Sequence, residues 1–184
     1  MEQPTTYSVF IGNVRLVSGL RDEVLRAMKR RFDRDPSALF LTFEDHTGRQ
    51  VDFDLRGTIE EVLDRAKPSR PHVGPGRPKL GVVARELSLL PRHWEWLEDQ
   101  PNGASAAIRR MVEEARNREP GEQQIRSKIK AAGRFLSAMA GDLPNYEEAS
   151  RALYRREGQR FEELIRRWPR DIREHSRRLL PGVF

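Results

Sequence analysis

Residues 81–117 read GVVARELSLLPRHWEWLEDQPNGASAAIRRMVEEARN, and their pattern decides how the chain can fold and assemble. Strand-favouring residues run up to Leu90, after which Pro91 suits the first turn of a helix. Asn102-Gly103 predicts a break between that helix and the next one. The expected order is strand, helix, turn and helix, over residues 82–90, 92–99, 101–103 and 105–116.

A unit of this size cannot bury a core alone, because a lone strand leaves both of its edges unpaired and two short helices cover little apolar surface. We therefore expect residues 81–118 to form a dimerisation unit, in which two copies of the chain pair through residues 80–116. Ser105 lies near the expected start of the second helix. The free N–H groups and the positive dipole end there are suited to binding a phosphate.

The same stretch resembles the ribbon-helix-helix family of bacterial DNA-binding proteins. Leu90-Pro91 matches the end of the family's strand, and GASAAIR at residues 103–109 matches the opening of its second helix. In that family two strands pair as an antiparallel ribbon that enters the major groove, while the second helix grips a phosphate. The resemblance and the neighbouring charges give the expected DNA contacts within this unit, which are Arg85, Arg92, Ala104, Ser105 and Arg109.

The register of the expected strand is open. In one register Arg85, Leu87 and Leu89 face the groove. A shift by one residue turns Ala84, Glu86 and Ser88 toward the groove instead. Leucine reads bases poorly and phosphates repel a glutamate, so neither register supplies a convincing set of base contacts. Sequence-tolerant DNA binding and a ribbon that serves dimerisation alone are both compatible with the sequence.

Residues 67–80 form the expected linker between domains. The stretch KPSRPHVGPGRPK contains four prolines and two glycines, which exclude a helix or a central strand, and its four basic residues have no acidic neighbour. Gly76-Arg77-Pro78-Lys79 resembles the core of an AT-hook, a short element that lies in the minor groove of A·T-rich DNA. The proline keeps the backbone extended, and a narrow groove attracts arginine. We therefore expect Arg77 and Lys79 to add affinity for double-stranded DNA.

Residues 1–66 predict a small α/β domain with the order ββαββα. YSVFI and VRLV flank Gly12-Asn13, and ALFLTF and QVDFDL flank residues 45–48, as the strands of two hairpins do. Apolar residues recur at helical spacing between Leu20 and Phe32. Thr58 and Glu61 form a capping box for a second helix over residues 59–66.

Residues 119–184 predict a helical bundle. Apolar side chains recur every three to four positions in four segments, and Gly-Pro-rich breaks separate the segments. Such helices bury their apolar stripes by packing together. The chain as a whole is therefore expected to be an α+β protein.

Composition excludes several classes of site. The 184 residues carry a net charge of +6 and no cysteine, and the four histidines lack the spacing of metal ligands, so we expect neither a metal nor another cofactor. No signal peptide and no membrane-spanning run is recognisable, which predicts a cytoplasmic protein. Asp45, His46, Asp52 and Asp54 form the only local cluster with catalytic potential, and alternation on a strand explains the aspartates. We predict no enzymatic activity, with a small hydrolase as an alternative.

Across its length the chain also resembles a family of bacterial proteins of unknown function, through stretches such as GRPKLGVVARELSLLPRHWEWL, FLSAMAGDLPNYEEASRALY and WPRDIREHSRRL. That resemblance implies no particular activity. Taken together, the sequence predicts a DNA-binding homodimer of the nucleoid, either a transcriptional regulator or a nucleoid-associated protein. The alternative is a protein-interaction adaptor that uses the central unit only to dimerise.

Overall fold

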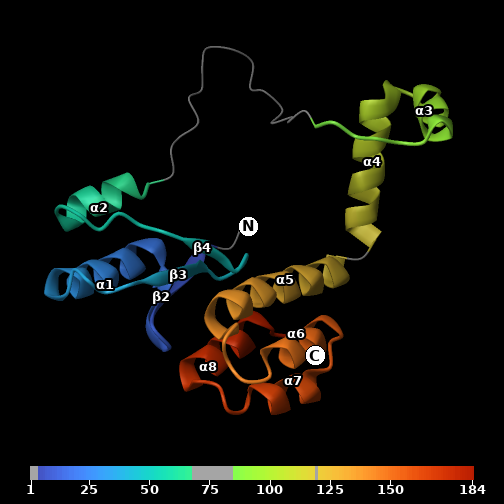
Figure 1. Ribbon diagram of the computed structural model, residues 1–184. Helices are drawn as coiled ribbons and strands as arrows, with labels where there is room; N and C mark the ends of the chain where they lie inside the picture. The colour runs from blue at the N-terminus through green and yellow to red at the C-terminus, as the bar shows by residue number, and fades with distance from the viewer. Residues whose placement is uncertain (1–3, 68–84, 119) are drawn as a thin grey trace. The chain divides into compact units, whose positions relative to one another are not determined.

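The computed structural model describes residues 4–67, 85–118 and 120–184, and these contain four strands and eight helices (Figure 1). The strands are β1 (Thr6–Ile11), β2 (Val14–Leu20), β3 (Leu41–Glu44) and β4 (Arg49–Val51). The helices are α1 (Arg21–Arg34), α2 (Ile59–Arg65), α3 (Pro91–Glu98), α4 (Gly103–Arg118), α5 (Pro120–Ala140), α6 (Tyr146–Tyr154), α7 (Gly158–Ile165) and α8 (Arg170–Leu179). The expected α+β class is confirmed.

The four strands form one antiparallel sheet with the order β2-β1-β3-β4. Gly12 turns the first hairpin with a φ of +55°, and Gly48 turns the second with a φ of +64°. Both turns fall where the sequence predicts them, because glycine accepts positive φ without a steric cost. The predicted order of strands and helices in residues 1–66 is therefore present.

One face of the sheet packs against α1 and α2. Val9 on β1 is fully buried, and so are Val24 and Leu25 on α1. The capping box that begins α2 is also present, since the Thr58 side chain accepts from the N–H of Glu61 and the Glu61 side chain accepts from the N–H of Thr58. The alternation of buried side chains along β1 sends its other residues to the opposite face.

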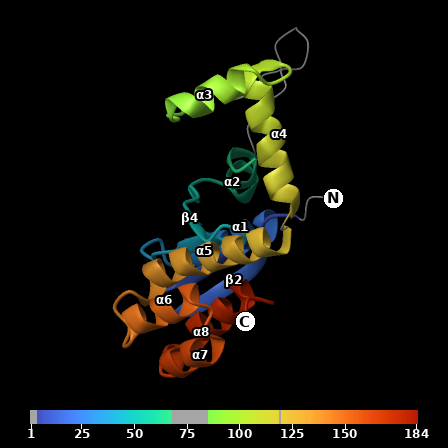
Figure 2. The same cartoon turned by 90° about the vertical axis from the view of Figure 1, so that its right-hand side faces the viewer.

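The C-terminal helices cover that opposite face (Figure 2). Phe10 on β1 and Phe43 on β3 are buried there with Phe135 of α5, at ring-centroid distances of 5.4 Å and 5.1 Å from it. The ring of His175 on α8 lies 4.4 Å from the ring of Phe135. These aromatic contacts join the N-terminal sheet to the C-terminal helices, which lie far apart in the sequence.

The division of the chain into units differs from the sequence-based expectation of a separate domain at residues 1–66 and a separate helical region at 119–184. One compact unit, unit 1, comprises Met1–Lys67 together with Gln124–Phe184, and the second, unit 2, comprises Pro68–Gln123. The physical reason is that a four-stranded sheet has two apolar faces, and α1 and α2 cover only one of them. The boundary between the two units falls after Lys67, where the expected linker at 67–80 begins, and residues 68–84 lie outside the described part.

Unit 2 holds α3 and α4 in its described part, and the turn at Asn102-Gly103 between them is found as expected. Leu97 of α3 and Ala107 of α4 are buried. Residues 85–90, which were expected to end a strand, run to α3 without forming one. A strand needs a partner for its backbone groups, and residues 85–90 find none among the described residues of this single chain.

Gly48 shows how closely the sheet and the C-terminal helices meet. A Cβ atom built on Gly48 would lie 2.0 Å from the carbonyl oxygen of Ala131 in α5, whereas one built on Gly12 would meet no atom within 4 Å. The guanidinium of Arg134 also donates to the carbonyl of Thr47, at 3.0 Å. The second hairpin turn is therefore pressed against the backbone of α5.

We expect Gly48→Ala to destabilise unit 1 far more than Gly12→Ala. Both variants place alanine at positive φ, which costs about 1 kcal/mol, but only Gly48→Ala must also push the turn away from α5, for a total of about 3 kcal/mol. Urea denaturation followed by circular dichroism would measure the difference. Equal losses for the two variants would contradict the packing of this turn on α5.

Candidate functional site

The surface of α3 and α4 in unit 2 is unusually apolar for its size. Leu87 and Leu90 expose 52% and 50% of their surfaces, and Trp96 exposes 50%. Met111 and Val112 on α4 are exposed as well. Clusters of exposed large apolar side chains on soluble proteins commonly mark interaction sites. Both tryptophans of α3, Trp94 and Trp96, reach the surface.

A hollow of about 350 Å³ lies within this surface. Its walls are apolar except for one histidine, and they consist of Leu87, Leu89, His93, Trp96, Leu97, Ile108 and Met111. A space of this size could hold roughly ten water molecules at liquid density, and the walls offer them few hydrogen bonds. The hollow is therefore suited to an apolar side chain or ligand. We call these residues, with Leu90 and Val112, the apolar surface of unit 2.

The residues predicted to contact DNA within unit 2 are mostly accessible. Arg85, Arg92, Ser105 and Arg109 are exposed, and Ala104 is half-buried. Arg109 donates from Nε to the carbonyl oxygen of Ser105 at 3.1 Å, which is a hydrogen bond within α4. Arg77 and Lys79 lie outside the described residues. No hydrogen bond or ion pair within the described part of the chain joins Arg85 or Arg92 to the start of α4.

The start of α4 has some features of an anion site. Its first turn carries no acidic residue, so nothing in that turn opposes the positive end of the helix dipole. Ser105 is the third residue of α4 rather than its cap, because the helix begins at Gly103. Ser105 therefore lies near the start of the helix, as expected, although the helix begins two residues earlier than predicted. Its hydroxyl is exposed on the first turn.

The described residues around α3 and α4 carry more negative than positive side chains, which does not favour binding to DNA. Residues 85–115 carry four arginines and six carboxylates, which are Arg85, Arg92, Arg109 and Arg110 against Glu86, Glu95, Glu98, Asp99, Glu113 and Glu114. The positive excess of this region therefore comes from the flanking residues 67–80, which have four basic side chains and no acidic one. Phosphate attraction would depend on that segment more than on α3 and α4.

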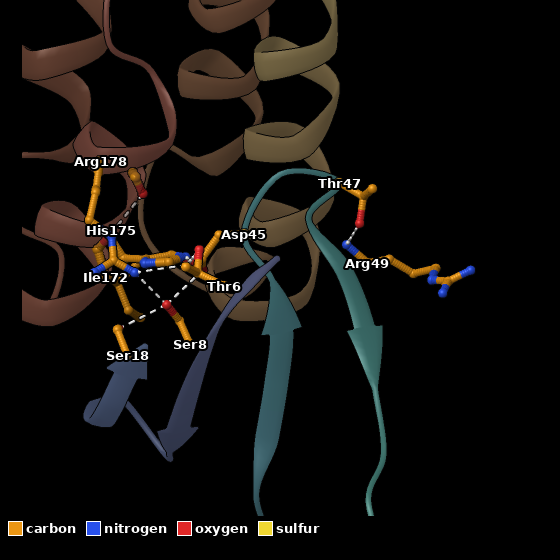
Figure 3. Close-up of polar contacts among 10 residues, drawn as sticks. Thr6, Ser8, Ser18, Asp45, Thr47, Arg49, Ile172, His175 and Arg178 are labelled. Atoms are coloured by element: carbon orange, nitrogen blue, oxygen red, sulfur yellow. Dashed lines mark hydrogen bonds and ion pairs between the residues drawn. The ribbon is translucent and has the colours of Figure 1, made fainter. Parts of the chain in front are cut away.

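A second polar cluster, in unit 1, lies between the sheet and α8 (Figure 3). Asp45, directly after β3, accepts hydrogen bonds from Thr6 Oγ1 and Ser8 Oγ of β1, both at 2.7 Å. Arg178 of α8 donates to Asp45 Oδ2 at 3.2 Å and also to Ser8 Oγ. The carboxylate of Asp45 thus links the C-terminal end of β3 to β1 and to α8.

His175 of α8 borders this cluster and is fully buried. Its Nε2 lies 3.8 Å from Asp45 Oδ1, and neither ring nitrogen has a hydrogen-bond partner within the described residues. Burial lowers the pKa of His175 to about 4, an effect that Arg178 and Arg15 strengthen and Asp45 opposes. Sequence reasoning missed this residue, although His175 follows the apolar stripe of α8 between Ile172 and Leu179.

The four residues considered for hydrolysis are not brought together. Asp45 faces β1 and α8, whereas Asp54 accepts hydrogen bonds from the Arg56 guanidinium, which hold the pKa of that carboxyl well below its usual range. His46 and Asp52 are exposed. Each aspartate therefore has a structural partner or faces solvent, and no shared reaction centre is formed by the four.

Neither a metal site nor a membrane-spanning helix is found in the described ranges. No group of three or more His, Cys, Asp or Glu side chains in residues 4–67, 85–118 and 120–184 is arranged to hold a metal ion. None of the helices found there has the length and the apolar composition that crossing a bilayer requires.

Comparison with known proteins gives one match. The family model described as "Uncharacterized protein conserved in bacteria (DUF2239)" matches residues 6–180, which is nearly the whole chain. No curated protein and no solved structure matches the chain significantly. The family resemblance noted from the sequence is confirmed, and the match names no ligand or reaction.

We expect the stability of unit 1 to fall between pH 6.5 and pH 4 because of His175. In the unfolded chain this histidine takes up a proton near pH 6.5, whereas in the folded chain it does so only near pH 4, so acid favours the unfolded state over that interval. His175→Leu should lose little stability at pH 7 and should show a shallower decline. Thermal melts across this pH range would test it.

His46→Leu is the matched control, because His46 is exposed and its removal should leave the decline in place. If His175→Leu and the unaltered protein lose stability equally between pH 6.5 and pH 4, then His175 is not the group responsible.

Proposed function

Since the chain belongs to the DUF2239 family of bacterial proteins, whose description names no activity, we propose from its own residues that it is a homodimer that binds double-stranded DNA. The second copy would pair with the first through residues 80–116. A transcriptional regulator or a nucleoid-associated protein would work in this way. The proposal rests on one observation above others, the apolar surface of unit 2.

Support for the dimer comes from the balance of burial in unit 2. Leu97 and Ala107 are the apolar side chains of α3 and α4 that are buried, while leucine, tryptophan and methionine side chains around them remain exposed. Burying a large apolar side chain contributes about 1.5–3 kcal/mol. A second copy would supply that burial and would also give residues 85–90 a partner for their backbone groups.

Support for DNA as the partner comes from basic residues that precede and follow α3 in the sequence. Arg77 and Lys79 lie in a segment with no acidic residue, and Arg109 lies on α4 one turn beyond its acid-free start. Pairing two chains would place two such basic segments on one particle. Joined sites bind a polyanion more tightly than separate ones, since the second contact becomes intramolecular.

A second candidate function is a protein-interaction adaptor. The excess of carboxylates over arginines in residues 85–115 favours it, because acidic side chains repel phosphates. In this case the same dimer would present its remaining exposed apolar side chains to another protein. A gel-shift experiment distinguishes the two candidates. A DNA-binding dimer retards DNA in a way that depends on duplex length, whereas an adaptor does not.

DNA binding should weaken steeply as salt rises, and the double variant Arg77→Ala/Lys79→Ala should bind more weakly without unfolding. Loss of two contacts to the DNA phosphates should reduce the magnitude of the slope of log affinity against log salt concentration by about 2 per bound chain. Fluorescence anisotropy with random and A·T-rich duplexes at several salt concentrations would measure both quantities. Arg109→Ala should lower affinity by a smaller amount.

Arg167→Ala serves as the control, because Arg167 is an exposed arginine in unit 1. An affinity that is unchanged in Arg77→Ala/Lys79→Ala would remove the basic segment from the proposal. A dimer with no measurable affinity for either duplex at low salt would favour the adaptor.

A further inference from the structure

One face of α3 carries a row of three exposed side chains with a particular order of charge. Arg92, Trp96 and Asp99 are spaced by four and three residues, so they lie above one another on the helix surface. Asp99 is the C-terminal cap of α3 and keeps helical backbone angles, so the row spans the full helix. A cation therefore stands at one end and an anion at the other, with a large aromatic side chain in the middle and the exposed carboxylate of Glu95 beside it.

The two charges of this row cannot pair with each other. Seven residues of helix separate them, which is a rise of about 10.5 Å. Neither Arg92 nor Asp99 forms an ion pair with any other residue that the structure describes. Charged side chains elsewhere behave differently, since Arg177 pairs with Glu162 at 2.6 Å and Arg170 pairs with Glu174 at 2.6 Å.

The charges at the two ends of this row are complementary to those of the same row on an antiparallel helix. If a second α3 lies antiparallel to the first, Arg92 of each copy comes opposite Asp99 of the other, and the two helix dipoles oppose each other favourably. The two-fold axis then passes close to Glu95 and Trp96, at the middle of the row. An interface of this kind uses the same patch on both copies, as dimers with two-fold symmetry require.

We propose that the two copies of the dimer meet through antiparallel pairing of their α3 helices along Arg92, Trp96 and Asp99. This inference rests on the homodimer of the proposed function and names its contact. Trp96 also forms part of the wall of the hollow, together with Leu87, Leu89 and Met111. Trp96 is the residue that the row and the hollow share, so pairing along the row also buries one wall of the hollow.

The pairing changes the expected role of one residue. Arg92, predicted from the sequence to contact DNA, becomes a residue of the dimer interface. Arg109 lies on α4 and takes no part in the row, so it stays available for phosphate. The inference therefore separates the residues for assembly from those for DNA.

A charge-swap series tests the pairing. In Arg92→Asp two like charges face each other at both ends of the interface, and the same is true of Asp99→Arg, so each variant should raise the dimer dissociation constant about tenfold. The double variant Arg92→Asp/Asp99→Arg restores opposite charges across the axis and should recover most of the affinity. Sedimentation equilibrium of the full chain at low salt would measure the three constants.

The controls keep the result specific. Asp52→Arg and Arg167→Asp make the same charge changes at exposed positions of unit 1 and should leave the dissociation constant unchanged. Circular dichroism would confirm that each variant is folded. A double variant that dissociates as readily as the single variants, or single variants that dimerise normally, would overturn the α3 pairing.

A DNA titration of the same proteins separates this inference from the proposed function. The double variant should bind DNA like the unaltered chain, whereas Arg109→Ala should lose affinity for DNA and remain a dimer. A dimer that obeys the charge swap but binds no DNA would support the α3 pairing and refute the DNA proposal. A monomer under all conditions would refute both.

Discussion

Burial of the second face of the sheet is the constraint on which the rest of unit 1 depends. Phe10 and Phe43 point away from α1 and α2, and they would face water if the C-terminal helices did not cover them. Phe135 supplies the ring that packs against both. Asp45 adds a polar joint at the edge of this core, because it accepts from two strand side chains and from Arg178 at once. Charge-assisted hydrogen bonds of this kind fix the relative orientation of the packed elements, which apolar contacts alone do not specify.

This arrangement makes unit 2 an insertion between two pieces of one folded unit. Its described helices bury little of their apolar surface, so their stability is coupled to whatever covers them. A unit that depends on a partner for its core is well suited to assembly, since folding and association then favour the same state. In the proposed dimer, the order of charges along α3 would give the pairing a direction, which apolar side chains alone would not do.

Local signals in the sequence predicted the elements well, and the division into units less well. The Gly12 and Gly48 turns and the Thr58–Glu61 capping box each involve residues only a few positions apart, so their chemistry can be recognised without the fold. His175 had no such signal. A histidine at the position of an apolar residue becomes noteworthy only when its ring nitrogens are seen to be buried beside Asp45, more than a hundred residues away.

By itself, the sequence determined the helices, the two hairpins with their turn positions and the α+β class, but its expectation of a strand was wrong for residues 85–90. The periodicity of apolar residues and the backbone preferences of glycine and proline are local properties, and they survive in any tertiary arrangement. Only the tertiary structure decided that the C-terminal helices share a core with the N-terminal sheet, and that Asp45 belongs to a joint with α8. The apolar stripe of an amphipathic helix shows that the helix must pack against a partner, but the stripe fits many partners equally well. The choice of partner therefore depends on contacts between distant segments, which no local pattern encodes.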